Sequence, residues 1–319
     1  MLFRSDLDGE LERFSEMAPE SDASVVVIGG CDDARTYRRM RWMGVSEYIA
    51  TPVDQEEISG ILAELAREKL ANGRVIDANR HVCVYGVRGG AGASSIAATL
   101  ATAMAEDHRA RTLLLDLDIR HGTQYLLFGF DPAEGLIDMF ETPARIDPLI
   151  MNRAMERVSQ NLSVLSSHSG EPDGAIHADS PRTLVTNGQR GFEYVITDVP
   201  ARNDECRDMI LTAGTLFLVT DATIPGLRDT LTTLGYLERH NYPHTPIIVI
   251  NRLGQHKGDG LSEADFKKRT GQRVLSVPFD PRVAARMITA NQSLPRQRGG
   301  MGRRINPLVA ALPTAGKRK

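Results

Sequence analysis

The 319-residue chain is poor in cysteine and in long apolar runs. Its three cysteines, Cys31, Cys83 and Cys206, lie far apart without CxxC or histidine-rich spacing, which argues against a disulfide framework or a zinc site. No apolar run approaches the roughly 20 residues that a membrane-spanning helix needs. The amino terminus also lacks the basic and then apolar pattern of an export signal. We therefore expect reduced thiols and a cytoplasmic protein.

An excess of charge of either sign is lacking, since 38 basic and 41 acidic side chains leave a formal net charge of −3. We therefore do not expect nucleic acid as a partner. Residues 296–319 are an exception, because they carry basic side chains and no acidic one. Contact of this segment with anionic lipid or nucleic acid stays open, but we expect a basic, disordered tail in solvent. It lacks the apolar face of a membrane-surface helix.

Short apolar runs alternate with helical patterns through most of the chain. Runs such as "TLLLDLD" and "PIIVIN" are apolar throughout, as strands covered on both faces are. Strands alternating with helices predict an α/β fold with a mostly parallel sheet flanked by helices. The strands are expected at residues 82–87, 112–117, 162–166, 193–198, 215–220 and 246–251.

A glycine-rich loop follows the first strand of this series. "VCVYGV" reads as a strand, "RGGAGA" as a turn and "SSIAATLATAMAE" as a helix, the context in which loops bind phosphate. Glycines let backbone N–H groups approach phosphate oxygens, and the helix amino terminus adds its dipole. Ser94 would bind Mg²⁺ or cap the helix. Ala93 stands where a phosphate loop carries its lysine, so a plain glycine turn with a serine cap remains open.

Three aspartates end strands of the same predicted sheet. Asp116 and Asp118 end one strand and Asp198 ends another. Ligands of parallel sheets gather beyond the carboxyl ends of the strands, where the glycine loop also lies. Aspartates at that edge suit a magnesium triphosphate, because Mg²⁺ needs few direct protein ligands. Together with the loop they predict phosphate binding.

From about residue 80 to 295 the motifs carry a family resemblance. "RGGAGASS", "LLLDLDIRHG", "YVITDVPA", "VTDATIPGLRDT", "VINR" and "VPFD" resemble, in this order, P-loop ATPases of the deviant Walker A class, ParA/MinD. Within that class the chain is most similar to the TadZ/CpaE proteins. This resemblance implies a role in Flp/Tad-type pilus assembly, a machinery similar to type IV secretion, through recruitment to the cell pole.

The resemblance also implies roles for individual residues. Asp118 would position the attacking water, and Arg88, in place of the signature lysine, would reach the partner's nucleotide in a homodimer. The expected metal ligands are Ser94, Asp116 and Asp198. The expected phosphate-binding residues are Gly89, Gly90, Ala91, Gly92, Ala93, Ser94 and Ser95. The segments expected to hold the adenine base contain Asn251, Arg252, Pro278, Phe279 and Asp280.

Two departures from the family pattern affect the expected chemistry. Arg88 keeps the positive charge and can grip phosphate with two donors. Ala93 removes the charge that would sit on the β- and γ-phosphates, and losing one such contact lowers rates by about 10²–10³. We therefore expect ATP and Mg²⁺ to bind and hydrolysis to be slow or absent. A DNA-partitioning ATPase of the ParA type and a nucleotide-free scaffold of the same fold remain alternatives.

Residues 1–72 resemble the second half of a response-regulator receiver, in the runs "VVVIGG" and "YIATPVD". The strands that would carry a phosphorylated aspartate are missing, so we expect an incomplete receiver-like α/β domain that binds a polar landmark or pilus protein. A truncated start of the chain, or a small segment packed on the ATPase domain, would give the same sequence. We expect a linker at 73–80, the ATPase domain at 81–295 and the basic tail at 296–319.

Overall fold

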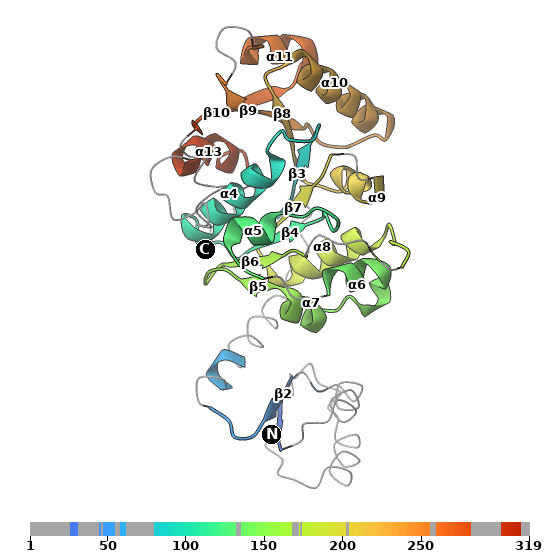
Figure 1. Cartoon of the computed structure of the whole chain (residues 1–319), viewed down its shortest axis with the longest axis vertical. Helices are drawn as coiled ribbons and strands as arrows, with labels where there is room; N and C mark the ends of the chain where they lie inside the picture. The colour runs from blue at the N-terminus through green and yellow to red at the C-terminus, as the bar shows by residue number, and fades with distance from the viewer. Residues whose placement is uncertain are drawn as a thin grey trace. The chain divides into compact units, whose positions relative to one another are not determined.

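A computed structural model of the chain describes residues 26–30, 45, 47–54, 58–61, 80–131, 135–167, 172, 174–201, 204–255, 260–281 and 301–313 (Figure 1). Contacts within the chain divide it into two units, Met1–Val75 and Ile76–Lys319.

The described residues of the amino-terminal unit include two parallel strands, β1 (Val26–Gly29) and β2 (Glu47–Ala50). They pair in register, with Ile28 opposite Ile49, and the Ile49 side chain is buried. Residues 58–61 are helical. The two strands lie in the runs "VVVIGG" and "YIATPVD", and the receiver-like character of this unit stays an expectation. The linker expected at 73–80 lies outside the described residues, except Arg80.

The second unit is built on an eight-stranded sheet with the order β10-β9-β8-β3-β7-β4-β6-β5. Neighbouring strands run parallel, except for β5 and β6, which are antiparallel. The expected α/β fold with a mostly parallel sheet is confirmed. The strands are β3 (His81–Gly86), β4 (Thr112–Asp116), β5 (Glu156–Arg157), β6 (Leu162–Leu165), β7 (Tyr194–Val199), β8 (Thr215–Asp221), β9 (Ile247–Leu253) and β10 (Arg273–Pro278).

Helices cover both faces of this sheet (Figure 1). Successive side chains of a strand point to opposite faces, so Val82 and Val84 join the core under α4, whereas Cys83 and Tyr85 join the core on the other face. The helices among the described residues of this unit are α4 (Ala93–Glu106), α5 (Gln124–Phe128), α6 (Leu136–Glu141), α7 (Pro148–Ala154), α8 (Ser180–Gly191), α9 (Asp204–Arg207), α10 (Ile224–Arg239), α11 (Glu263–Thr270) and α13 (Met301–Val309), with short 3-10 turns at Pro143–Arg145 and Asp208–Leu211.

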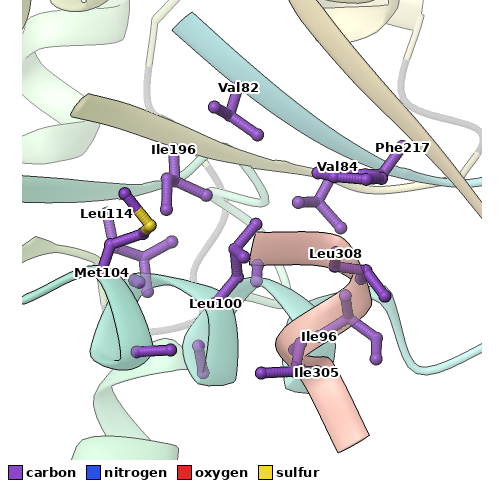
Figure 2. Close-up of a cluster of buried hydrophobic side chains, with 14 of the residues drawn as sticks. Val82, Val84, Ile96, Leu100, Met104, Leu114, Ile196, Phe217, Ile305 and Leu308 are labelled. Atoms are coloured by element: carbon purple, nitrogen blue, oxygen red, sulfur yellow. The ribbon is translucent and has the colours of Figure 1, made fainter. Parts of the chain in front are cut away.

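The carboxyl-terminal segment is part of this core, which corrects the expectation of a disordered tail for residues 301–313. Figure 2 shows Ile305 and Leu308 of α13 beside Ile96 of α4, below the strands. Ile305 and Leu308 are fully buried, and Leu312 beyond the helix is nearly so. The Tyr194 hydroxyl also donates to the carbonyl of Pro313. A spacing of three and four residues places these apolar side chains on one helix face, a signal that the surrounding glycine and arginine residues obscure.

Strand order places the glycine loop at the point where the topology reverses. From β3 the chain crosses over α4 to β4 and then β6, returns to β7 beside β3, and continues on the opposite side through β8, β9 and β10. Ligands of open parallel sheets bind at such a reversal, beyond the carboxyl ends of the strands. Within the described residues, no helix combines the length and the hydropathy required to cross a bilayer.

Candidate functional site

The glycine loop joins β3 to α4 and requires glycine at two positions. Gly90 and Gly92 have φ angles of 77° and 88°, the left-handed region that other residues avoid. A Cβ on Gly92 would also lie 2.3 Å from Asn251 Nδ2 and 3.5 Å from Arg252 Nη2. Gly89 and Gly90 are exposed, so the loop opens to solvent. The turn therefore presents bare backbone at a helix amino terminus, the arrangement that binds anions.

Asn251 fastens this loop to the end of β9. Its Nδ2 donates to the carbonyl of Ala91 at 2.9 Å, and its Oδ1 accepts from the N–H of Arg252 at 3.0 Å. The Asn251 side chain is buried, whereas Arg252 is exposed with a left-handed φ of 56°. Asn251 thus holds the loop, and the Arg252 guanidinium lies beside it.

The two segments expected to hold a base lie side by side. Pro278 of β10 pairs with Leu253 of β9, after a register shift, and the Phe279 N–H donates to the Leu253 carbonyl at 2.9 Å. Phe279 and Asp280 are half-buried, and Pro278 is exposed. The structure therefore brings residues 251–252 and 278–280 together at the end of β9 and β10.

Ser94 and Asp198 meet beside the start of α4. Asp198, in β7, is 3% exposed, and the Ser94 side chain lies near enough to lower the pKa of its carboxylate. Ala93 and Ser95 flank Ser94 in the first turn of α4 and are half-buried. A hydroxyl and a carboxylate at this point suit Mg²⁺, which binds oxygen ligands and keeps several of its waters. No group of three or more histidine, cysteine or acidic side chains in the described part of the chain is placed to hold a metal.

Gln124, at the start of α5, is a member of this cluster that the sequence reasoning missed. Its Nε2 donates to Asp198 Oδ2 at 2.8 Å and to the Ser94 carbonyl at 3.1 Å. The side chain is fully buried, and its Oε1 receives no hydrogen bond from any described residue. A buried acceptor without a donor costs about 1–3 kcal/mol. A buried amide at the end of a loop has no sequence motif that would have revealed it.

Asp116 holds the loop that follows β4. Its Oδ2 accepts from the N–H groups of Thr123 and Gln124 at 3.0 and 3.1 Å and from Ser166 Oγ at 2.9 Å, and its Oδ1 accepts from the Asp118 N–H at 3.2 Å. The side chain is 1% exposed. Four protein donors occupy this carboxylate, which fits a structural role better than the expected role as a metal ligand.

Asp118 lies on the same loop but is partly open to solvent. Its side chain is 27% exposed, and its Oδ1 accepts from the His121 N–H at 2.9 Å. The negative charge of Asp118 acts on Asp198. Of the three predicted aspartates, Asp118 is therefore the one that stands free enough to meet a water molecule or a substrate.

Arg88 lies near an acidic residue that the sequence reasoning did not single out. Its Nη1 is 3.8 Å from Asp221 Oδ1 at the end of β8, and both side chains are about one-third exposed. Asp221 Oδ1 also accepts from Thr223 Oγ1 at 2.6 Å. Its place at a strand end beside the loop is the signal that would have revealed Asp221. An exposed pair of this length contributes little energy, so Arg88 can leave it easily.

Burial raises the pKa of both buried carboxylates above the ordinary value of an aspartate. Burial raises the pKa of Asp116, and the charge of Asp198 raises it further. Burial likewise raises the pKa of Asp198, although hydrogen bonds from Ser94 and Gln124 oppose this. Buried carboxylates repel each other, and a cation bound between them and a phosphate stabilises their ionised forms. The residues present thus fit a magnesium nucleotide.

Comparison with known proteins gives distant relatives. No protein-family model matches the sequence. An uncharacterised protein of Mycobacterium tuberculosis is 28% identical over 311 residues, covering 96% of this chain and 84% of the relative. The septum site-determining protein MinD of Synechocystis is 27% identical over 178 residues, which cover 55% of this chain and 65% of that protein.

Solved structures are similar over most of the chain. A ParA family ATPase from Chlorobium tepidum superposes with a TM-score of 0.66 at 19% identity, covering 73% of this chain and all of that one. MinD of Pyrococcus horikoshii in complex with Mg-ADP superposes with a TM-score of 0.59 at 16% identity, over 74% and 96% of the two chains. The chain therefore has the fold of the ParA/MinD ATPases, with its glycine-rich loop at the point where the strand order reverses.

Proposed function

We propose that the protein binds ATP with Mg²⁺ and acts as a nucleotide-stabilised homodimer that positions a larger assembly, with slow or absent hydrolysis. The observation that carries this proposal is the meeting of the Ser94 hydroxyl and the buried Asp198 carboxylate beside a glycine loop. A magnesium nucleotide needs two parts, an anion site open to solvent and a pair of metal-binding residues, and both lie at the carboxyl ends of the strands.

Each part of the site has a separate role in this proposal. The backbone N–H groups of residues 89–95 bind the phosphates, and Ser94 with Asp198 holds the metal. When bound, Mg²⁺ neutralises charge on the phosphates. Asp116 is reassigned from metal ligand to the residue that shapes the Asp118 loop, because its four hydrogen bonds already occupy it. Residues 251–252 and 278–280 enclose the base.

Ala93 sets the low rate of hydrolysis. It is the first residue of α4, and its methyl group places no charge near the phosphates. Restoring the ammonium with Ala93→Lys should raise turnover by about 10²-fold or more, since one electrostatic contact is worth about 10²–10³. Phosphate release measured for both forms, with Asp118→Ala added to the lysine variant as a control, tests this. Equal rates for wild type and Ala93→Lys would show that Ala93 is not the cause.

The homodimer requires the Arg88 guanidinium to leave Asp221 of its own chain. In this structure the guanidinium rests on Asp221 at 3.8 Å, a weak and exposed contact. In the proposed dimer, two chains sandwich two nucleotides, and each Arg88 reaches the phosphates of the partner. A planar guanidinium is suited to that bidentate contact.

The assembly that we propose is the Flp/Tad-type pilus, with the protein recruited to the cell pole through its amino-terminal unit. The support is the resemblance of the loop, with alanine at position 93, and of the "DLDIRHG" segment to the TadZ/CpaE proteins. A fluorescent fusion expressed at native level should form polar foci, and deletion of the gene should abolish the pili. Diffuse fluorescence together with normal pili would contradict this assignment.

A nucleotide-free scaffold is the second candidate, and Ala93 is the observation that favours it. A scaffold would show no saturable binding of ATP or ADP, yet would keep its polar location. A DNA-partitioning role has less support, because the formal net charge of −3 opposes non-specific DNA binding. DNA binding that weakens steeply with salt would revive it.

A further inference from the structure

Gln124 connects three parts of the site that the sequence places far apart. Its backbone N–H donates to Asp116 at the end of β4, at 3.1 Å. Its side-chain Nε2 donates to Asp198 in β7, at 2.8 Å, and to the Ser94 carbonyl in α4, at 3.1 Å. Since Gln124 begins α5 directly after the Asp118 loop, residues 117–123, one side chain joins that loop to both proposed metal-binding residues.

The oxygen of the Gln124 amide, Oε1, is buried, and no residue that the structure describes donates a hydrogen bond to it. Methionine would fill a similar volume without an unsatisfied acceptor, so packing alone does not explain a glutamine at this position. An unsatisfied acceptor next to Ser94 and Asp198 has an obvious use once a hydrated cation or its phosphate-bound waters occupy that space.

We propose that Gln124 is a positioning residue that couples occupation of the magnesium end of the site to the Asp118 loop. This inference rests on the proposed function. Its amide fixes the orientation of the Asp198 carboxylate, and its backbone directly continues the Asp118 loop, whose last residue, Thr123, shares the Asp116 carboxylate with it. A change at Ser94 or Asp198 therefore reaches the residues that precede Gln124 in the chain.

The test compares Gln124→Met with Thr123→Ala, both in the full-length chain. Gln124→Met keeps the backbone donor and approximate volume but removes the amide. Thr123→Ala is a matched control, because Thr123 is exposed and its side chain makes no capping hydrogen bond, while its N–H still bonds Asp116. The two readouts are ADP affinity by calorimetry, in EDTA and in Mg²⁺, and amide hydrogen exchange of residues 117–123.

For wild type and Thr123→Ala, we expect Mg²⁺ to tighten ADP binding and to slow exchange in the Asp118 loop. For Gln124→Met, affinity in EDTA should stay within about twofold. The gain from Mg²⁺ should fall by about 10–100-fold, as for other partners that orient metal ligands. Exchange in the loop should then be the same with and without Mg-ADP.

Three results would overturn the inference. If Mg²⁺ tightens ADP binding to Gln124→Met as much as to wild type and Mg-ADP still slows hydrogen exchange in the Asp118 loop, the amide does not couple the metal to the loop. Equal losses in EDTA and in Mg²⁺ would show a purely structural role. Wild type that binds no nucleotide would overturn the proposed function and this inference with it, which distinguishes that failure from the first two. If Gln124→Met melts too early to assay, Gln124→Asn, whose amide is one methylene short, gives the same comparison.

Discussion

At the scale of single residues, glycine at position 92 is required for two separate reasons. Its left-handed φ disfavours any side chain, and a Cβ there would meet Asn251 Nδ2 at 2.3 Å. Gly92→Ala should therefore lower the free energy of unfolding by about 1–3 kcal/mol. Gly89→Ala is the control, because no atom lies within 4 Å of its Cβ position and its φ is not left-handed. Urea unfolding of both variants checks this; equal stabilities would contradict it.

Asp198 is predicted to trade stability for metal binding. Burial raises the pKa of Asp198 above its unfolded value. The free energy of unfolding is therefore highest below the unfolded pKa, where Asp198 is neutral, and it falls as pH rises through the folded pKa and the buried carboxyl ionises. Asp198→Asn should thus raise the free energy of unfolding at pH 8 by up to about 3 kcal/mol, since one pKa unit is worth about 1.36 kcal/mol and the pKa of Asp198 rises from 3.8 to about 6. The gain should vanish near pH 4.

Thermal unfolding at both pH values checks the stability of this variant, and calorimetry with ADP checks its response to Mg²⁺. The same variant should lose the tightening of ADP binding by Mg²⁺. A variant less stable than wild type at pH 8, or one that keeps the magnesium effect, would show that the buried carboxylate is not held for the metal.

Sequence reasoning located the loop and the strand-end aspartates because their residue types and positions are typical of phosphate sites. It could not separate Asp116 from Asp198, because both end strands and only the hydrogen bonds distinguish them. Gln124 escaped it altogether, since a buried amide beginning a five-residue helix leaves no pattern.

At the scale of elements, α13 shows how packing overrides composition. Leu308 is fully buried in the core shared with α4. Leu308→Ala should lower the free energy of unfolding by about 2–5 kcal/mol, whereas Asn306→Ala, on the exposed face, should change it by at most about 0.5 kcal/mol. Urea denaturation with unchanged slope measures both. If Leu308→Ala left the free energy of unfolding unchanged, residues 301–313 would be the solvated tail expected from composition.

The strands were predictable where apolar runs were continuous, as in β4, β8 and β9. β10 was not among the strands expected, because "RVLSVP" mixes polar and apolar residues and lies at the sheet edge, half-buried. The order of the strands could not be derived from their sequence, since it depends on which crossovers pack against the sheet.

At the scale of the whole molecule, the fold places an anion site but does not name its biological use. The proposal that ATP stabilises a homodimer predicts a doubling of mass in light scattering when Mg-ATP is added. Arg88→Ala should stay monomeric, whereas Arg228→Ala, which removes an exposed arginine of α10 paired with its neighbour Asp229, should dimerise like wild type. A constant mass in all samples would exclude the nucleotide-stabilised dimer.

The most direct test of the central claim is a calorimetric titration of the full-length protein with ATP in the presence of Mg²⁺. Saturable binding of about one nucleotide per chain, competed by ADP and weakened in EDTA, is the result that we predict. A titration with no heat of ATP binding and no competition by ADP would contradict the account. The glycine loop would then have the shape of a nucleotide-binding loop but bind no nucleotide.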